Sequence, residues 1–289
     1  MMTRRTFQRG VLLAASGALA SSPAADQPVV RGLDHIPVAV RDLERAKADF
    51  EALGFTLKPG RPHANGLRNA HVKFPDGTEI ELIAVPAAVD ALTSEYQRWL
   101  EGGDGPAFLG LFAPDFRSLG EHLSRLGLVL HEAGNLGTFT EPAALRRLFF
   151  ARRQHSPTDR PEHFAHANTA VSLAGVWLAG AEAMQLLLPA LGAVPAETSR
   201  CGPFGTGSTS LALPEGEIVC LPATAQLAQG RPIVAATVKV RSVETARSVL
   251  QGHRMRYRQL PGCSRDSLWV APDDAHGLWL EFWQQSASR

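Results

Sequence analysis

Two side chains that can bind a cation or move a proton, His35 and Glu81, lie in short apolar stretches. His35 falls within residues 33–40, where the alternation of apolar residues predicts a strand, and alone it is most simply a buried imidazole. Residues 78–83 predict a second strand, on which Glu79 and Glu81 share one face and the apolar residues share the other. A carboxylate in so apolar a strand is unfavourable unless it is paired or binds a cation. Glu81 is therefore expected to have a partner.

Polar residues that could contact a substrate lie between these strands and further along the chain. Arg68 and Asn69 offer a cation and an amide, which suit a carboxylate or enolate, although ordinary turn polarity explains them equally well. The segment between the two halves of the sequence carries His163 and His166, which are three residues apart. Their side chains share one face only if the segment is helical. In a linker that is not helical, a histidine side chain is usually exposed and has no function. The four histidines that could add to a site are His63, His71, His163 and His166.

One pattern of strand, turn and amphipathic helix occurs four times. Its first strands are predicted at residues 33–40, 108–113, 173–178 and 233–240. Asp42, Asp115 and Ser242 stand where a helix N-cap is expected, and Gly54, Gly127 and Gly192 stand where a helix ends in a left-handed residue. Strand-like stretches follow each helix, so each unit is expected to consist of a strand, a helix and about three further strands.

These units predict an α+β fold. A small curved sheet with one helix leaves its concave face uncovered, so the unit must pair with another, and the paired sheets enclose a pocket. Four tandem βαβββ units therefore give two pairs of curved mixed sheets with helices outside. We expect the first pair at residues 31–160, a linker at 161–170 and the second pair at 171–285.

Three stretches resemble a known superfamily: residues 33–40, 76–82 and 66–71, the last reading G-L-R-N-A-H. They are similar to the vicinal oxygen chelate superfamily, which includes glyoxalase I, extradiol dioxygenases, fosfomycin-resistance transferases and bleomycin-resistance binding proteins. Residues 66–71 resemble its glyoxalase-like domain branch. The fold hosts several reactions, so the resemblance names a fold without naming a reaction.

The resemblance implies a role for several residues. His35 and Glu81 would point into one concave sheet and bind a divalent metal ion, with Glu81 also catalytic; the alternative is a structural His–Glu pair. Substrate-binding candidates are Arg68, Asn69, His63 and His166. The other units lack obvious further ligands. The positions aligned with His35 are Phe108, Leu173 and Ala235, and those aligned with Glu81 are Cys220, Glu281 and a position near Phe150.

Three hypotheses for function follow. The first is a metal-dependent lyase, isomerase or dioxygenase that acts on a small oxygen-rich substrate, with the metal unidentified. The second is a metal-free protein that binds or sequesters a small molecule, as in bleomycin resistance. In the third, the second pair is an inert scaffold for the first. A glutathione-dependent glyoxalase is disfavoured by the incomplete ligand set and by the export signal described below.

The composition limits the classes of molecule that the protein is expected to bind. The 289 residues carry 29 Lys and Arg against 28 Asp and Glu, a net charge of +1, which is not the basic excess of a nucleic-acid binder. Three cysteines are too few for a disulfide scaffold. We expect a small-molecule partner and a monomer or homodimer. The arginine pairs 146–147 and 152–153 flank a predicted strand and are expected to be solvated edge charges.

Residues 1–25 predict an export signal. Residues 3–7, Thr-Arg-Arg-Thr-Phe, resemble the twin-arginine motif, and an apolar stretch at 11–20 and small residues follow. Cleavage after Ala20 or Ala24 fits the small-residue rule. This signal predicts a periplasmic protein. No other stretch approaches the roughly 20 apolar residues of a membrane span, so no stable membrane insertion is expected after cleavage.

Overall fold

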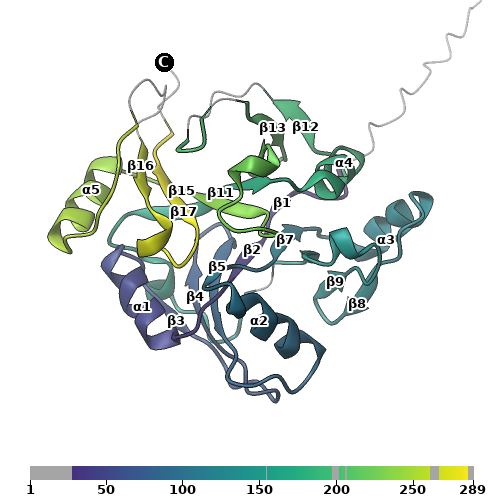
Figure 1. Ribbon diagram of the computed structural model, residues 1–289, viewed down its shortest axis with the longest axis horizontal. Coiled ribbons are helices and arrows are strands. Elements are labelled where there is room, and N and C mark those ends of the chain that lie inside the picture. The colour runs from purple at the N-terminus through teal and green to yellow at the C-terminus, as the bar shows by residue number, and fades with distance from the viewer. Residues whose placement is uncertain (1–27, 154, 197–201, 206, 261–266, 286–289) are drawn as a thin grey trace, which may run out of the picture.

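The computed structural model describes residues 28–153, 155–196, 202–205, 207–260 and 267–285. The predicted export signal at residues 1–25 therefore lies outside the described residues. The prediction of an α+β fold built from βαβββ units is confirmed: the chain forms three such units and a fourth that has two strands after its helix in the described residues (Figure 1).

The first two units form separate five-stranded sheets. In the first, the order is β3-β4-β5-β2-β6, and in the second it is β1-β7-β10-β9-β8. The first unit comprises β2 (His35–Ala39), α1 (Leu43–Ala52), β3 (Lys58–Pro59), β4 (Arg68–Lys73) and β5 (Glu79–Ala84), followed by α2 (Ala91–Glu101) and β6 (Gly105–Pro106). The second comprises β7 (Leu109–Phe112), α3 (Phe116–Arg125), β8 (His131–Ala133), β9 (Leu136–Thr138) and β10 (Leu148–Ala151), with β1 (Gly32–Leu33) at its edge.

The last two units share one seven-stranded sheet of order β12-β13-β14-β11-β15-β17-β16. The third unit comprises β11 (Ala170–Ala179), α4 (Glu182–Ala190), β12 (Val194–Ala196), β13 (Thr209–Ala212) and β14 (Glu217–Leu221). The fourth comprises β15 (Ile233–Val240), α5 (Val243–Gly252), β16 (Ser267–Val270) and β17 (Trp279–Trp283). The antiparallel contact of β11 with β15 joins the two units.

The helix boundaries follow the predicted signals. The side chains of Asp42, Asp115 and Ser242 accept hydrogen bonds from backbone N–H groups in the first turns of α1, α3 and α5. After α1, α3 and α4 the chain turns at Gly54, Gly127 and Gly192, whose φ angles are +91°, +73° and +104°. These predictions are confirmed.

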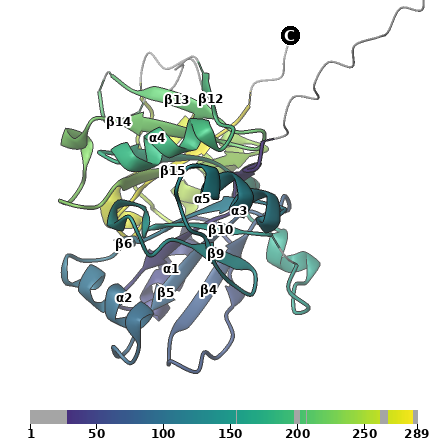
Figure 2. The ribbon, with the colours of Figure 1, turned by 90° about the vertical axis from the view of Figure 1, so that its right-hand side faces the viewer.

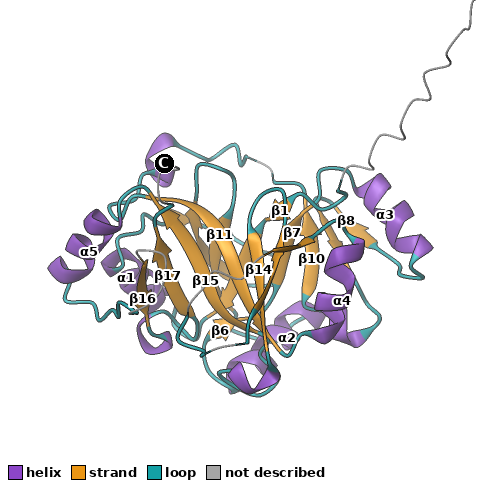
Figure 3. Ribbon diagram, turned by 90° about the horizontal axis from the view of Figure 1, so that it is seen from above, coloured by secondary structure: helices purple, strands orange, loops and turns teal. Residues whose placement is uncertain are grey.

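Units one and two meet edge to edge, and the two pairs pack together. The N–H of Ala107 donates to the carbonyl of Pro37 at 2.8 Å, and the N–H of Asp34 donates to that of Gly110 at 2.9 Å. Figure 2 shows the sheet of the second pair above those of the first, and Figure 3 shows helices around the outside of the strands. Between the pairs, the Phe55 and Phe282 rings stack with their centroids 5.6 Å apart.

One predicted edge charge lies instead in the interior. The side chain of Arg153 is 10% exposed and forms an ion pair with Glu215 of the third unit. Its guanidinium also donates to the carbonyl of Leu33. The prediction that Arg153 is solvated is therefore wrong, because the packing of one pair against the other covers it.

Helix α2 was not predicted by the repeat. It begins at an Asp90 N-cap that forms a reciprocal capping box with Thr93. Tyr96 and Trp99 on its buried side join Phe108 and Phe149 in an apolar cluster on the inner face of the first pair. This helix therefore covers part of the concave surface that the unit alone would leave open. Among the helices of the described ranges, none has both the length and the apolar character needed to cross a membrane.

Candidate functional site

Five polar residues gather on the inner face of the first sheet, and we call them the inner-face cluster: His35, Asn69, His71, Glu79 and Glu81. The strand register brings them together, since His35 lies opposite Glu79 and His71 lies opposite Glu81. Because side chains alternate along a strand, all five project to the same side, away from the apolar residues that face α1. The two predicted metal ligands therefore share one surface.

His35 is held between two carboxylates. Its Nδ1 lies 2.5 Å from Oδ1 of Asp34, and its Nε2 lies 3.6 Å from Oε2 of Glu81. Its ring meets the ring of Phe149 edge to face, with 4.7 Å between centroids. Burial alone would lower the pKa of His35, but the hydrogen bond to Asp34 and the charges of Asp34, Glu79 and Glu81 outweigh it and raise the pKa to about 9. Without a bound metal ion, His35 is thus an imidazolium at neutral pH.

Asn69 fixes the Glu81 carboxylate. Its Nδ2 donates to Oε1 of Glu81 at 2.6 Å, which leaves Oε2 facing His35. Asn69 is only 9% exposed, and its Oδ1 packs against Gly60. Any residue other than glycine at position 60 would place its Cβ 1.8 Å from this oxygen. The glycine therefore permits the asparagine to pack against the strand at this point.

The remaining members of the cluster form a second ion pair. Nδ1 of His71 lies 3.3 Å from Oε1 of Glu79, whose other oxygen lies 3.5 Å from Nζ of Lys73. Burial would raise the pKa of Glu79, but the hydrogen bond from His71 and the charges of His35, His71 and Lys73 lower it to about 2. Burial acts to lower the pKa of His71, and the hydrogen bond to Glu79 and the charges of Glu81 and Glu79 overcome it and raise that pKa. Glu79 is therefore a charged structural partner.

The second unit has phenylalanines at the two equivalent positions. His35 stands seven residues before the N-cap Asp42, and Phe108 stands seven residues before the N-cap Asp115. Glu81 is opposite Pro37, two residues after His35, and Phe149 is opposite Gly110, two residues after Phe108. The partner position for Glu81 is thus Phe149 instead of a residue near Phe150. The inner face of the first pair is polar on one side and aromatic on the other.

The second pair keeps a single carboxylate at an equivalent position. Glu281 lies opposite Thr237, two residues after Ala235, just as Glu81 lies opposite Pro37, two residues after His35. The strand register therefore agrees with the alignment of Ala235 with His35. The Oγ1 of Thr237 donates to Oε2 of Glu281 at 2.7 Å and accepts from Nε1 of Trp177 at 3.0 Å. Glu281 is 3% exposed. Its hydrogen bonds favour a structural role.

In the third unit the alignment is shifted. Leu173 and Cys220 were aligned with His35 and Glu81, but both side chains belong to the large core on the opposite face. The inner-face residues at this level are Trp177 and Val219, which are opposite each other on β11 and β14. The register shifts along β11 account for the difference.

Two predicted substrate residues are separated from the cluster. Arg68 precedes Asn69 on β4, so its side chain projects to the other face, where it is exposed. His166 is 8% exposed, and both ring nitrogens are used: Nδ1 accepts from the N–H of Thr56 at 3.0 Å and Nε2 lies 2.9 Å from the carbonyl of Lys73. The structure therefore does not bring Arg68 and His166 to the inner-face cluster, and His166 attaches the linker to the first sheet.

The other two histidines lie outside the strands of the first sheet. His63 lies between β3 and β4, with its Nε2 buried and without a hydrogen-bond partner among the described residues. His163 lies in a short 3₁₀ helix (Pro161–Phe164), where its Nδ1 accepts from the N–H of Arg160 at 3.1 Å. The structure thus brings His35, Asn69 and Glu81 together and adds His71, one of the histidines that the sequence offers as a further ligand.

The cluster fits part of a metal site. Nε2 of His35 and Oε2 of Glu81 face each other, and the bond from Nδ1 to a carboxylate is the arrangement that usually orients a metal-binding histidine. Within the described residues, however, no group of three or more His, Cys, Asp or Glu side chains is arranged to hold a metal ion. The described part of the chain therefore offers two protein donors at this cluster, where catalytic metal sites usually have three.

Tyr96 is a residue near the cluster that sequence analysis missed. It is 3% exposed, and its ring meets that of Phe108 edge to face at 5.3 Å. Burial, followed by the negative charge of Glu81, raises the pKa of its phenol well above the usual value. A capping residue at Asp90 followed by apolar residues at helical spacing (Tyr96, Trp99, Leu100) was a signal that could have found this helix.

Paired βαβββ units with polar residues on an inner concave face define a protein of the vicinal oxygen chelate fold. The sequence matches the Glyoxalase-like domain family over residues 33–192, more than half of the chain. The chain belongs to this family.

Solved structures with the same fold include two enzymes. The 2,3-dioxygenase LapB from Pseudomonas sp. KL28 is 15% identical, with a TM-score of 0.62 over 91% of this chain and 94% of that one. A mutant 4-hydroxymandelate synthase from Streptomyces coelicolor is 12% identical, with a TM-score of 0.62 over 90% and 94%. A hypothetical protein from Staphylococcus aureus is 14% identical, with a TM-score of 0.58 over 88% and 99%. No curated protein sequence matches the chain. These identities show a common fold alone.

Proposed function

We propose that the chain is an enzyme of the vicinal oxygen chelate type that acts on a small oxygen-rich substrate at the inner-face cluster. The observation that carries this proposal is a line of polar contacts, Asp34 to His35 to Glu81 to Asn69, on the concave face of the first pair. The dioxygenase and synthase neighbours with this fold support an enzyme of this class.

Each residue in the line has a distinct task in this proposal. Glu81 presents Oε2 to the substrate and removes a proton from a carbon next to a carbonyl, or from a hydroxyl. Asn69 holds the other oxygen of Glu81, so that only one can move. Asp34 fixes the ring of His35 with Nε2 toward the same point. Phe108 and Phe149 on the aromatic side exclude water from a bound substrate.

We further propose that His35 and Glu81 hold a divalent metal ion. When bound, the ion supplies Lewis acidity that stabilises negative charge on a substrate oxygen. The contact of His35 with Asp34 supports this, because it leaves Nε2 as the ring nitrogen that faces Glu81. With two protein donors, the coordination would be completed by water and by vicinal oxygens of the substrate.

Metal analysis of the full chain tests this proposal. The protein is purified without chelator, equilibrated with Mn²⁺, Zn²⁺ or Fe²⁺ and dialysed, and its bound metal is measured. We expect one equivalent of one of these ions, lost in both His35→Ala and Glu81→Gln. The matched control is the exposed neighbouring pair on β8, as His131→Ala and Glu132→Gln, which should keep the metal. Equal metal content in site and control variants would contradict the proposal, as would no bound metal with any of the three ions.

A second candidate is a metal-free protein that binds a small apolar ligand. The phenylalanines at positions 108 and 149, where a paired unit could have supplied further ligands, favour it specifically. In this case a bound ligand is retained in the double variant His35→Ala, Glu81→Gln and in the presence of a chelator. Loss of binding under both conditions favours the metal-dependent enzyme.

We also propose that the chain acts in the periplasm. The proposal rests on the twin-arginine motif and the apolar stretch within residues 1–25.

A further inference from the structure

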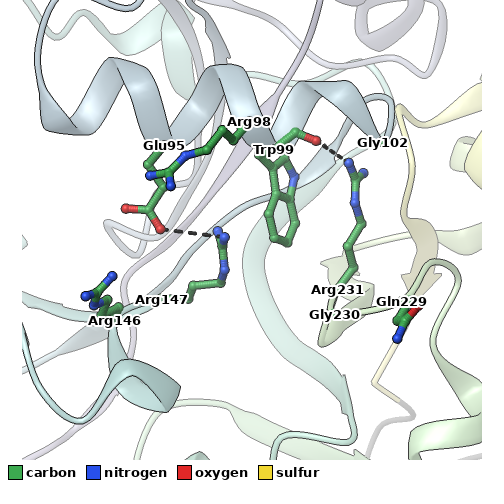
Figure 4. Close-up of a pocket in the computed structure, with 9 residues that line it drawn as sticks. All are labelled: Glu95, Arg98, Trp99, Gly102, Arg146, Arg147, Gln229, Gly230 and Arg231. Atoms are coloured by element: carbon green, nitrogen blue, oxygen red, sulfur yellow. Dashed lines mark hydrogen bonds and ion pairs between the residues drawn. The ribbon is translucent and has the colours of Figure 1, made fainter.

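A basic cavity lies outside the inner-face cluster. It has a volume of about 410 Å³ and is bounded by α2, by the residues that precede β10 and by the loop that leads into β15 (Figure 4). Four arginines line it: Arg98, Arg146, Arg147 and Arg231. The described residues that line it include one carboxylate, that of Glu95, so the cavity carries an excess of positive charge in a chain whose net charge is only +1.

Two of these arginines are fixed on either side of an indole ring. The guanidinium of Arg147 lies 4.0 Å from the centroid of the Trp99 ring, and that of Arg231 lies 4.6 Å from it. Figure 4 shows the two groups on opposite sides of the ring. Arg231 donates to the carbonyls of Gly103 and Asp104, both at 2.9 Å, and to that of Trp99. Arg147 donates to the carbonyl of Ala107 at 3.2 Å and lies 3.6 Å from Glu95. These cations are therefore positioned before any ligand arrives.

The other two arginines leave most of their donors for a ligand. Arg98 is exposed, and its Nε donates one long hydrogen bond, 3.3 Å, to the carbonyl of Ser94. Arg146 is half exposed, donates to the carbonyl of Thr140 at 3.0 Å, and has an exposed carboxylate, that of Glu141, at 3.7 Å. A guanidinium has five N–H donors, so several from each residue remain available at the cavity.

The positive charges repel one another. Burial, and the charges of Arg231 and Arg98, lower the pKa of Arg147, against the opposing effect of Glu95. An anion bound between the guanidinium groups relieves this repulsion and accepts charge-assisted hydrogen bonds in pairs, the geometry that suits carboxylate and phosphate groups.

A second cavity adjoins the first and is apolar on part of its wall. Its volume is about 350 Å³, and it shares Glu95, Arg146, Arg147 and Gly230 with the first. The residues on its other side are mostly small or apolar, with two polar side chains, Glu182 and Gln226, among them: Ala143, Ala144, Gly180, Ala181, Ala183, Met184 and Pro232. A ligand with its anionic group among the arginines can therefore place an apolar part here.

We propose that these two cavities form a binding site for a small organic oxyanion, a carboxylate or phosphate ester, whose apolar part lies against Ala144, Ala181 and Met184. The site goes beyond the function proposed for the inner-face cluster. The expectation that residues 146–147 are solvated edge charges is thereby corrected for Arg147, whose side chain is 27% exposed and stacked on Trp99.

Calorimetric titration of the full chain tests the proposal. The probes are inorganic phosphate, phenyl phosphate and benzoate, each at constant ionic strength in a buffer without other oxyanions. We expect phenyl phosphate to bind more tightly than inorganic phosphate, because the ring occupies the second cavity. The double variant Arg98→Gln, Arg146→Gln should bind about tenfold more weakly than the native chain. The control Arg117→Gln, an exposed arginine on α3, should bind as the native chain does.

The outcomes separate the possible ligands. Binding of phenyl phosphate without benzoate identifies a phosphate ester, and the reverse identifies a carboxylate. Lack of binding by both organic anions overturns the proposal, and so does equal affinity of the double variant and the Arg117 control. Because Arg98 and Arg146 are exposed, their replacement should leave the thermal unfolding midpoint close to that of the native chain, which is measured alongside.

Discussion

The imidazole of His35 and the carboxylate of Glu81 face each other from two parallel neighbouring strands, with Nε2 3.6 Å from Oε2. Each is fixed by a further hydrogen bond, which joins His35 to Asp34 and Glu81 to Asn69. The same positions of the second unit hold Phe108 and Phe149. The polar side chains of the inner face therefore lie on the first of the two units in this pair. The contribution of each to metal binding can be tested separately.

Removing the amide of Asn69 should loosen Glu81 without unfolding the chain. Asn69→Ala loses one hydrogen bond to a carboxylate, and we expect metal affinity to fall by about 10- to 100-fold, as for other residues that orient a metal ligand. A competition titration with a metal indicator measures the affinity. Asn65→Ala, which removes an amide that bonds the exposed Asp90, should leave it unchanged. Equal losses in the two variants would assign Asn69 no special role.

The stability of the metal-free protein should fall as the pH rises above neutrality. The folded-state pKa of His35 is raised to about 9 from 6.5, so its contribution is fully present below pH 6.5 and is lost as the pH rises through 9. Urea unfolding in the presence of a chelator, repeated from pH 6 to pH 10, measures this. The decline should be shallower in His35→Gln, where a part remains because the pKa of His71 is also raised. A native profile that is flat over this range would contradict the assignment.

Asp159 should anchor the end of the first sheet through two buried lysines. Lys58 and Lys73 both form ion pairs with it, and the three side chains are 8%, 10% and 7% exposed. Because Asp159→Asn leaves two buried cations without this partner, we expect a loss of about 3–5 kcal/mol in the free energy of unfolding. Glu121→Gln removes an exposed partner of Arg117 and should cost less than about 1 kcal/mol.

Low pH should remove the stabilisation that Asp159 contributes. Burial would raise the pKa of Asp159, but hydrogen bonds from Lys58 and Lys73 lower it to about 2. Its stabilisation is thus present above the ordinary pKa, 3.8, and is lost as the pH falls from there through 2. Unfolding free energies measured between pH 2 and pH 6 should fall less steeply in Asp159→Asn than in the native chain. Parallel curves would show that Asp159 is not the residue responsible.

The second pair should contribute stability without contributing to metal binding. Thr237→Val removes the hydroxyl that links Trp177 to Glu281, and we expect a loss of about 1–3 kcal/mol because buried polar groups lose a partner. Metal content should stay at the native value. A variant that folds normally but has lost its metal would show that the second pair takes part in the site.

Export should depend on the two arginines near the N-terminus. Because twin-arginine signals are recognised by a receptor, Arg4→Lys together with Arg5→Lys should keep the chain in the cytoplasm. Cell fractionation and immunoblotting measure the distribution. Arg9→Lys is the control, since Arg9 lies outside the motif and its replacement should leave export intact.

Local signals predicted most of the fold. The N-caps Asp42, Asp115 and Ser242 and the turn at Gly54 depend on a few neighbouring residues, so the sequence reveals them directly. The pairing of four units followed from their repetition. Glu81 was recognisable because a carboxylate on an apolar strand requires a partner.

The rest depended on register and on packing between units. Arg68 was separated from Asn69 by simple strand alternation, which could have been applied to that stretch in advance. The position of Phe149, by contrast, required the pairing of β10 with β7. The partial burial of Arg147 against Trp99 required the position of α2, a helix that the repeat does not contain. Such contacts join residues far apart in sequence, so no local pattern shows them.

Anomalous diffraction from crystals of the full chain grown with Mn²⁺ shows directly whether His35 and Glu81 hold a metal ion. We expect one strong anomalous peak within about 2.0–2.3 Å of both Nε2 of His35 and Oε2 of Glu81, with the remaining ligands water. A peak elsewhere, or a map in which His35 still contacts Glu81 directly with no metal between them, would contradict it.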